Sequence, residues 1–177
     1  MTTFTQRMLG AALLDRRIYE EVEADSRANG QAVAVVLLAS LAGGIGLPGL
    51  RVPEVQALVV GIAGALLGWV TWATLTYLIG TQFLPEPQTR ADVGELMRTI
   101  AFASVPGVLR VLGVTPVLGW PIYAIASIWM LLAMIVAVRQ ALDYQSLGRA
   151  LAVCVVGWSL SLAVAVIIAI VSARPVS

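Results

Sequence analysis

The sequence predicts an all-α membrane protein: a polytopic helix bundle of about five spanning helices with an N-terminal amphipathic surface helix. Two observations carry this prediction. Of the 177 residues, 59% are hydrophobic and only 12% are charged, which is about half the charged fraction of a soluble domain. The mean hydropathy is +0.91, and the apolar residues form long runs separated by short polar or Gly/Pro-rich stretches.

Composition also excludes several classes of function. The net charge of +1 leaves no basic footprint for nucleic acid. The chain has no His, which is the commonest metal ligand and general base. Serines within the apolar runs, such as Ser104 and Ser127, therefore have no partner base. We expect no catalytic residue, no cofactor and no metal, and hence no enzyme.

Residues 1–28 are predicted to be a cytoplasmic amphipathic segment, with one helix over residues 4–28 lying on the membrane. Helical spacing relates a set of apolar residues: Phe4, Met8, Ala11, Leu14, Ile18 and Val22. Acidic residues follow on the polar face: Glu20, Glu21, Glu23 and Asp25. They are either a solvated, salt-paired surface or a docking surface for a cytoplasmic partner.

Residues 29–173 are predicted to be one membrane domain. Its expected spans are about 29–47, 55–83, 93–113, 117–138 and 150–172. The first span ends in a run of Gly and Pro at residues 43–49, and polar loops at residues 84–91 and 139–149 separate later spans.

Small residues four apart mark two of these spans. Ala42 and Gly46 lie in the first span, and Gly64 and Gly68 lie in the second, with Gly61 close by. Small residues let helices approach closely in a membrane. We expect both faces to pack within the bundle, with a seam between two copies as the alternative for the second span.

The predicted third span is unusual because it carries charge, including Glu95, Arg98 and Arg110, just after Asp92. Pro106 also removes a backbone donor in its middle. Charge and freed backbone at membrane depth must be buried in protein or lie near water, so we expect this helix inside the bundle.

Different partners are expected for the two arginines of this span. Arg98 is close enough to pair with Glu95 or Asp92. Arg110 has no acid within four residues and must reach the far headgroups or a carboxylate on another helix. Three roles remain open for these charged residues: an internal salt bridge, a contact site for a partner or lipid headgroup, or a transport path.

Orientation follows from the distribution of arginine. With five spans, eight arginines fall on the side of the N-terminus and three on the other: Arg51, Arg110 and Arg174. The positive-inside rule then predicts a cytoplasmic N-terminus. With four spans, the count becomes ten against one, so the N-terminus is predicted inside in either case.

Four blocks of sequence resemble the Yip family of Ypt/Rab-interacting membrane proteins in its bacterial form. They are YEEVEAD at residues 19–25, WATLTYLIG at 72–80, GELMRTIAFASVPG at 94–107 and AVRQALDYQSLGRA at 137–150. The resemblance implies five membrane helices after a cytoplasmic N-terminal segment. Eukaryotic relatives act in vesicle traffic and contact prenylated small GTPases. This chain lacks their long N-terminal extension, so we do not expect GTPase binding.

The resemblance and the missing catalytic groups together indicate a non-catalytic protein of the bacterial cytoplasmic membrane. We expect it to contact the lipid bilayer and to organise or bind membrane partners or lipids, a membrane-protein partner or a second copy included. The alternative is a small transporter or channel with its path along the charged third span.

Overall fold

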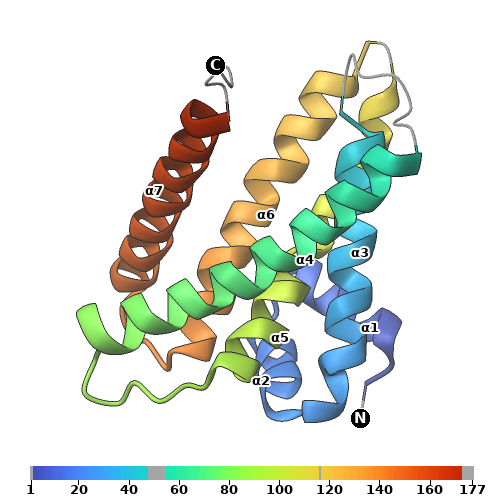
Figure 1. The fold of residues 1–177 in the computed structure, drawn as a ribbon. Helices are drawn as coiled ribbons and strands as arrows, with labels where there is room; N and C mark the ends of the chain where they lie inside the picture. The colour runs from blue at the N-terminus through green and yellow to red at the C-terminus, as the bar shows by residue number, and fades with distance from the viewer. Residues whose placement is uncertain (1, 48–54, 116, 173–177) are drawn as a thin grey trace.

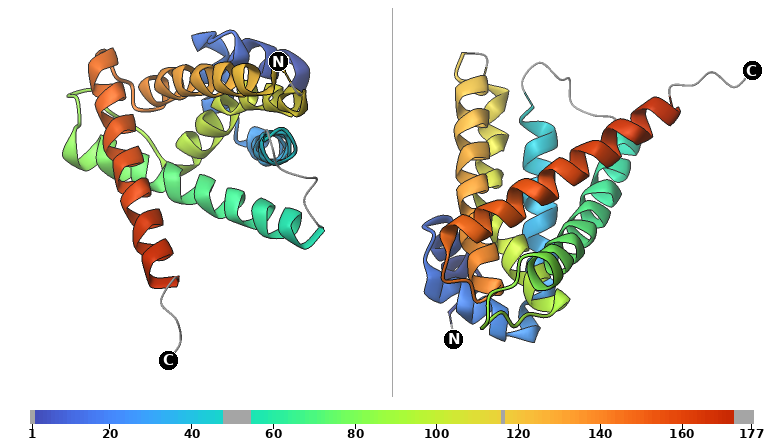
Figure 2. Two further views of the ribbon diagram at one scale, coloured as in Figure 1. Left: turned by 90° about the horizontal axis from the view of Figure 1, so that it is seen from above. Right: turned by 90° about the vertical axis from the view of Figure 1, so that its left-hand side faces the viewer.

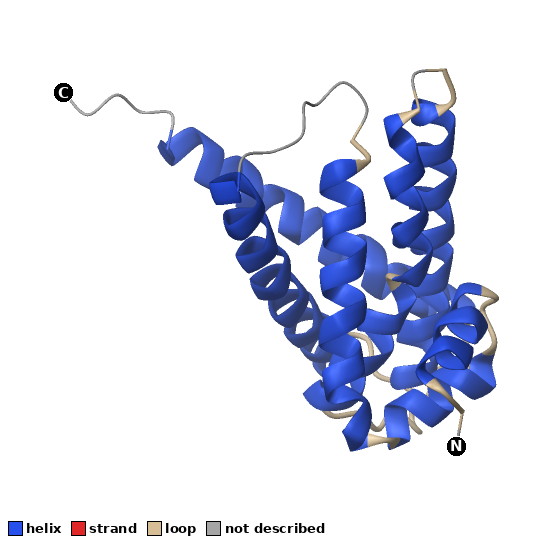
Figure 3. Cartoon of the chain, turned by 90° about the vertical axis from the view of Figure 1, so that its right-hand side faces the viewer, coloured by secondary structure: helices blue, strands red, loops and turns tan. Residues whose placement is uncertain are grey.

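A computed structural model describes residues 2–47, 55–115 and 117–172, and these residues form helices without any strand (Figures 1 and 3). The turn around Arg51 and the residue Arg174 lie outside the described residues. In chain order the elements are α1 Phe4–Ala12, α2 Arg16–Ala24, the 3-10 helix η1 Ser26–Ala28, α3 Asn29–Ile45, α4 Val55–Leu78, the π-helix η2 Ile79–Phe83, α5 Val93–Ala103, the 3-10 helix η3 Val105–Val114, α6 Gly119–Ala141 and α7 Leu147–Ser172.

Four helical stretches are long and apolar enough to cross a membrane: Ser26–Ile45, Leu58–Phe83, Val93–Val114 and Gly119–Ala141. A shorter apolar stretch, Leu147–Leu160, begins α7. The predicted class of a membrane helix bundle is therefore confirmed, and an apolar helix lies in each of the five predicted ranges. Half of the third stretch is buried, against 6% of the second, so the expectation that the charged span lies inside the bundle is also confirmed.

The N-terminal segment is not the single surface helix that its spacing predicts. Leu14 adopts a left-handed conformation, with φ at 61°, and ends α1. Asp15 then caps α2 by accepting a hydrogen bond from the backbone N–H of Arg17 at 3.0 Å. The two short helices fold back on the bundle, and Tyr19 and Val22 are fully buried. The apolar face of this segment therefore covers protein rather than lipid alone.

Backbone contact joins α3 to η3. A methyl group at Gly46 would overlap the carbonyl of Arg110, and one at Gly113 would overlap the carbonyl of Gly46. The close approach expected for the small residues of the first span is therefore confirmed, with η3 as the partner. α5 ends at Ala103, just before Pro106, and the chain continues as a 3-10 helix. The break expected at Pro106 is confirmed as well.

The small residues of α4 behave differently from those of α3. A Cβ built at Gly61, Gly64 or Gly68 would meet no atom within 4 Å. The expected packing of this face within the bundle is wrong. α4 and α7 lean away from α3 and α6 (Figure 2) and meet where Trp72 stacks on Trp158, with ring centroids 6.1 Å apart.

Candidate functional site

Two of the predicted contact residues, Glu21 and Asp25, are bound by a buried arginine. Nη2 of Arg7 lies 2.8 Å from Oε1 of Glu21 and 2.7 Å from Oδ2 of Asp25. Nη1 of the same side chain donates to Oε1 of Gln31 at 3.0 Å. Arg7 is only 2% exposed, so this group of charges ties α1 to α2 and to the start of α3.

Hydrogen bonds from Arg7 hold the pKa of Glu21 and the pKa of Asp25 below their ordinary values. These two carboxylates stabilise the N-terminal packing and leave little free charge for a partner. Sequence reasoning missed Arg7, although it lies three residues after Phe4 and four before Ala11, on the helix face that is buried.

Arg98 does not pair with an acid among the described residues, and the expected bridge to Glu95 or Asp92 is wrong. Its Nε donates to the carbonyls of Val22 and Glu23, each at 3.1 Å, and Nη2 also donates to the carbonyl of Glu23. These carbonyls close α2, where the last turn lacks intrahelical donors and carries partial negative charge. A helix end from another part of the chain therefore replaces the carboxylate.

Asp92 and Glu95 instead cap their own helix. Oδ1 of Asp92 accepts from the N–H of Gly94 at 2.5 Å and from the N–H of Glu95 at 3.1 Å. Oε2 of Glu95 accepts from the N–H of Asp92 at 2.8 Å. This reciprocal arrangement is a capping box, which fixes the start of α5.

An acidic cavity of about 360 Å³ lies at the same end of the bundle. It is lined by Glu20, Glu23, Ala24, Glu95, Gln140 and Asp143. Burial, followed by the charges of Glu95, Asp143 and Glu20, raises the pKa of Glu23 to about 7. Among the described residues, no group of three or more His, Cys, Asp or Glu side chains is placed so that it could hold a metal ion.

Arg110 has a different environment from every other predicted contact. It projects from η3 beside α3, where a Cβ at Gly43 would lie 3.8 Å from its Nη1. Its guanidinium carbon stands 5.2 Å from the centre of the Tyr123 ring. Among the described residues no carboxylate lies within ion-pair distance of Arg110, and its buried Nε has no hydrogen-bond acceptor.

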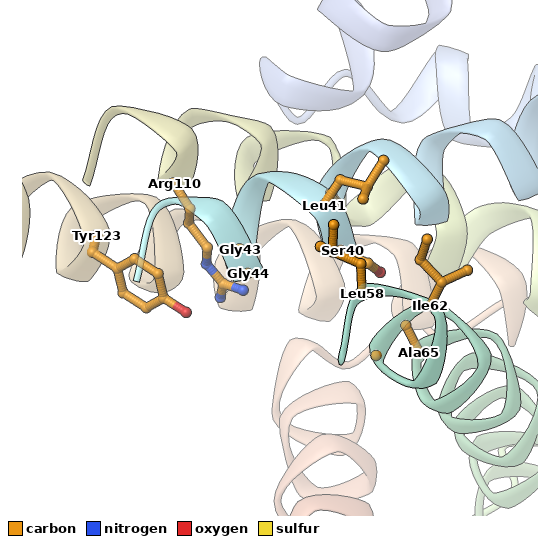
Figure 4. A pocket seen from close by; sticks show the side chains of 11 residues that line it. Ser40, Leu41, Gly43, Gly44, Leu58, Ile62, Ala65, Arg110 and Tyr123 are labelled. Carbon is orange, nitrogen blue, oxygen red and sulfur yellow. The ribbon is translucent and has the colours of Figure 1, made fainter. Parts of the chain in front are cut away.

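Two adjoining cavities meet at this arginine. The first, here called the upper cavity, has a volume of about 490 Å³. Figure 4 shows Arg110 and Tyr123 on one side of it and Leu58 and Ile62 of α4 on the other. The lower cavity has a volume of about 250 Å³ and extends between α3, α4, α5 and α6. Four residues line both cavities: Ala39, Ser40, Ala65 and Arg110.

The structure thus separates the eight predicted contact residues. Glu21, Asp25, Asp92 and Arg98 hold the fold together, Glu20, Glu23 and Glu95 line the acidic cavity, and Arg110 stands apart at the upper and lower cavities. Sequence reasoning missed Tyr123 and the walls from α3 and α4. The sequence offered one signal for them, the lack of an acid near Arg110. An arginine without a local partner must be contacted by residues of other helices.

Comparison with known proteins gives one match. A family model described as the Yip1 domain matches residues 15–171, a range that begins at the cap of α2 and ends near the end of α7. No curated protein matches the chain. No solved structure matches it either.

Proposed function

Because the chain belongs to the Yip1 family of multi-span, generally non-catalytic membrane proteins, we propose that it binds a membrane client rather than catalysing a reaction. The client carries an anionic oxygen group, a phosphate or a carboxylate, that binds Arg110. A single observation carries this proposal: a guanidinium lines two cavities within the membrane domain and has no acidic partner among the described residues.

The free-energy cost of placing the Arg110 guanidinium in a membrane-spanning segment supports an anionic client. An arginine at the centre of a spanning helix costs about 2.5–3.5 kcal/mol on insertion scales, and this is an upper bound for Arg110, which lies near the end of the stretch Val93–Val114. Contact with the Tyr123 ring returns about 0.5–2 kcal/mol. An anionic oxygen on the guanidinium would offset the part of the cost that the ring does not. The planar guanidinium also offers paired donors that match a phosphate or carboxylate.

Transport along the third span has less support. Arg98 is 8% exposed, and Thr99, the next residue, and Phe102, one turn further along α5, are fully buried. No residue lines both the acidic cavity and either cavity at Arg110. A path from one end of the bundle to the other would have to open between these buried side chains.

The setting of this function is also a proposal. We place the protein in the cytoplasmic membrane of a bacterium, as the resemblance to bacterial Yip proteins implies. Its N-terminus is then in the cytoplasm, because the arginines concentrate on that side. Glu20 and Glu23 are then candidate contacts for a cytoplasmic or membrane-protein partner. The part of α4 around Gly64, which lines neither cavity, is available to lipid or to a second copy.

Substitution of Arg110 tests the proposal. Affinity for phosphatidylglycerol is measured by native mass spectrometry on detergent-purified protein. We expect Arg110→Gln to weaken binding by about 10- to 100-fold, the loss of a charge-assisted hydrogen bond of about 1.5–3 kcal/mol. Arg90→Gln is the matched control, since it removes the same charge from an exposed loop position. Equal affinity of wild type and Arg110→Gln would refute the proposal, and anion flux into liposomes that depends on Arg110 would favour transport.

A further inference from the structure

We infer that the client is an anionic membrane lipid whose headgroup binds Arg110 and whose acyl chain occupies the lower cavity. This inference rests on the proposed function and deepens it by naming the source of the anionic group. A free phosphate or a soluble carboxylate would use only the upper cavity. A lipid uses both.

The two cavities share Arg110 and differ in the residues beyond it. The upper cavity adds the Tyr123 side chain and the small residues Gly43 and Gly44 to apolar residues of α4. The lower cavity is walled by Val36, Trp72, Ile100, Met130 and Met134, among others. Unbranched methionine side chains adapt to an irregular apolar occupant.

The serine hydroxyls of the lower cavity are satisfied by their own helices, whereas the buried Nε1 of Trp72 has no hydrogen-bond acceptor among the described residues. The Ser40 hydroxyl donates to the carbonyl of Val36 at 2.6 Å, and the Ser104 hydroxyl donates to the carbonyl of Ile100 at 3.3 Å. Besides Arg110 and the Trp72 indole, the lower cavity offers few free polar groups, and its apolar side chains favour a hydrocarbon chain.

The length of the combined site also fits one chain. Along α4 the lining runs from Leu58 to Trp72, which is about 21 Å at 1.5 Å per residue. Half of a hydrocarbon core of about 30 Å is about 15 Å, the depth of one leaflet. The site can thus take a headgroup and one acyl chain of a single leaflet.

Arg110 lies at the end of the bundle where the headgroup of a lipid is expected. The backbone carbonyl of Arg110 lies against Gly46, the residue that follows the last turn of α3, and its guanidinium lies near Gly43 in that last turn. The end of a spanning helix lies near the membrane–water interface, where lipid phosphates and carboxylates are found. Trp72 and Ile100 lie further along the spans, toward the membrane interior.

The open glycines of α4 give a matched set of variants. Gly68 lines the lower cavity, Gly61 lines the upper cavity, and Gly64 lines neither. A Cβ at any of the three meets no atom within 4 Å, so a side chain can begin at each position without clash. Gly68→Leu fills the lower cavity and leaves Arg110 intact, and Gly64→Leu is the control on the same helix.

Native mass spectrometry with two probes tests the inference: dioleoyl-phosphatidylglycerol, and glycerol 3-phosphate as a headgroup without chains. We expect Gly68→Leu to weaken lipid binding about tenfold, from the exclusion of two or more methylene groups. Its affinity for glycerol 3-phosphate should stay within twofold of wild type. Gly64→Leu should match wild type with both probes.

Each other outcome overturns the inference in a recognisable way. Lipid binding that is unchanged in Gly68→Leu but weakened in Arg110→Gln would leave the anion site standing and place the chain elsewhere. Equal weakening of both probes would mean that the leucine acts on Arg110 itself. Equal effects of Gly64→Leu and Gly68→Leu, with loss of a dimer, would make the α4 face an interface between copies.

A measurement on wild-type protein keeps the test independent of the variants. Phosphatidylglycerols with chains of increasing length are compared at equal mole fraction in the micelle. We expect affinity to rise up to about fourfold for each added methylene and then to level off when the cavity is full. Affinity that does not depend on chain length would overturn the inference.

Discussion

Replacing Arg7 with methionine removes a buried cation that joins α1 to α2 and α3. The substitution leaves Glu21 and Asp25 without the guanidinium that lies 2.8 and 2.7 Å from them. Breaking a fully buried ion pair costs about 3–5 kcal/mol. The side chain of Arg7 is 3% exposed but that of Glu21 is 29% exposed, so we expect about 2 kcal/mol, reduced by solvent screening.

Thermal unfolding in detergent measures this loss. For a chain of this length, 1 kcal/mol corresponds to a shift of about 2–4 °C in Tm, so Arg7→Met should lower Tm by about 4–8 °C. Arg17→Met is the control, because Arg17 is exposed on α2. Adding Glu21→Gln to Arg7→Met should recover part of the loss, since it removes one carboxylate that has lost its partner.

The pH dependence gives a second test of the same contact. Arg7 lowers the pKa of Glu21 and of Asp25 in the folded state. A lowered pKa contributes stability that is present above the unfolded value, 4.5 for Glu, and is lost as pH falls through the folded value. The advantage of wild type over Arg7→Met should therefore shrink below about pH 4.5. A Tm difference below 1 °C, or one that does not change with pH, would refute the reasoning.

Three further substitutions test other parts of the structure. Gly46→Ala should cost about 1–3 kcal/mol by forcing α3 from η3, whereas Gly44→Ala, with open space around it, should be neutral; equal Tm values for the two variants would contradict the contact. Glu23→Gln should raise Tm at pH 8 and have no effect near pH 4.5. The raised pKa of about 7 means that the stability contributed by the protonated Glu23 carboxyl is lost as pH rises through 7. A pH-independent change in Tm would argue against this origin. Arg98→Ala should lower the yield of folded protein, and adding Glu95→Gln should not restore it, since the partners of Arg98 are carbonyls; restoration would favour a bridge to Glu95.

Local signals allowed much of the fold to be predicted. Long apolar runs marked the helices, and Gly- and Pro-rich or polar stretches marked their ends. Pro106 marked the change from α5 to η3 because a missing N–H acts on its own helix. Such effects depend on neighbours in the sequence and can be inferred without tertiary structure.

Partners from distant parts of the chain could not be predicted in this way. Arg98 binds carbonyls of Val22 and Glu23, more than seventy residues earlier. The small residues of α3 and of α4 look alike in sequence, yet a Cβ at Gly46 would overlap η3 and one at Gly64 would meet nothing within 4 Å. Small residues permit close approach, but the arrangement of the other helices decides whether a neighbour is there.

The same reasoning applies to the candidate site. The lone charge of Arg110 and its lack of a nearby acid were evident from the sequence. The surrounding residues were not, because they come from α3, α4 and α6. Which helices form a cavity around one side chain is a property of the packed bundle, since each helix shows only its own periodicity in the sequence.

Cross-linking of a bound lipid tests the central claim most directly. The probe is phosphatidylglycerol with a photoreactive diazirine midway along one acyl chain, and the adducts are mapped on peptides of the purified protein. We expect adducts to concentrate on the lower-cavity residues Trp72, Met130 and Met134 and to fall at least fivefold in Arg110→Gln, within the 10- to 100-fold loss of affinity expected for that variant. Adducts spread over exposed faces of α4 and α6, at a level that Arg110→Gln does not change, would contradict the claim that Arg110 holds a lipid.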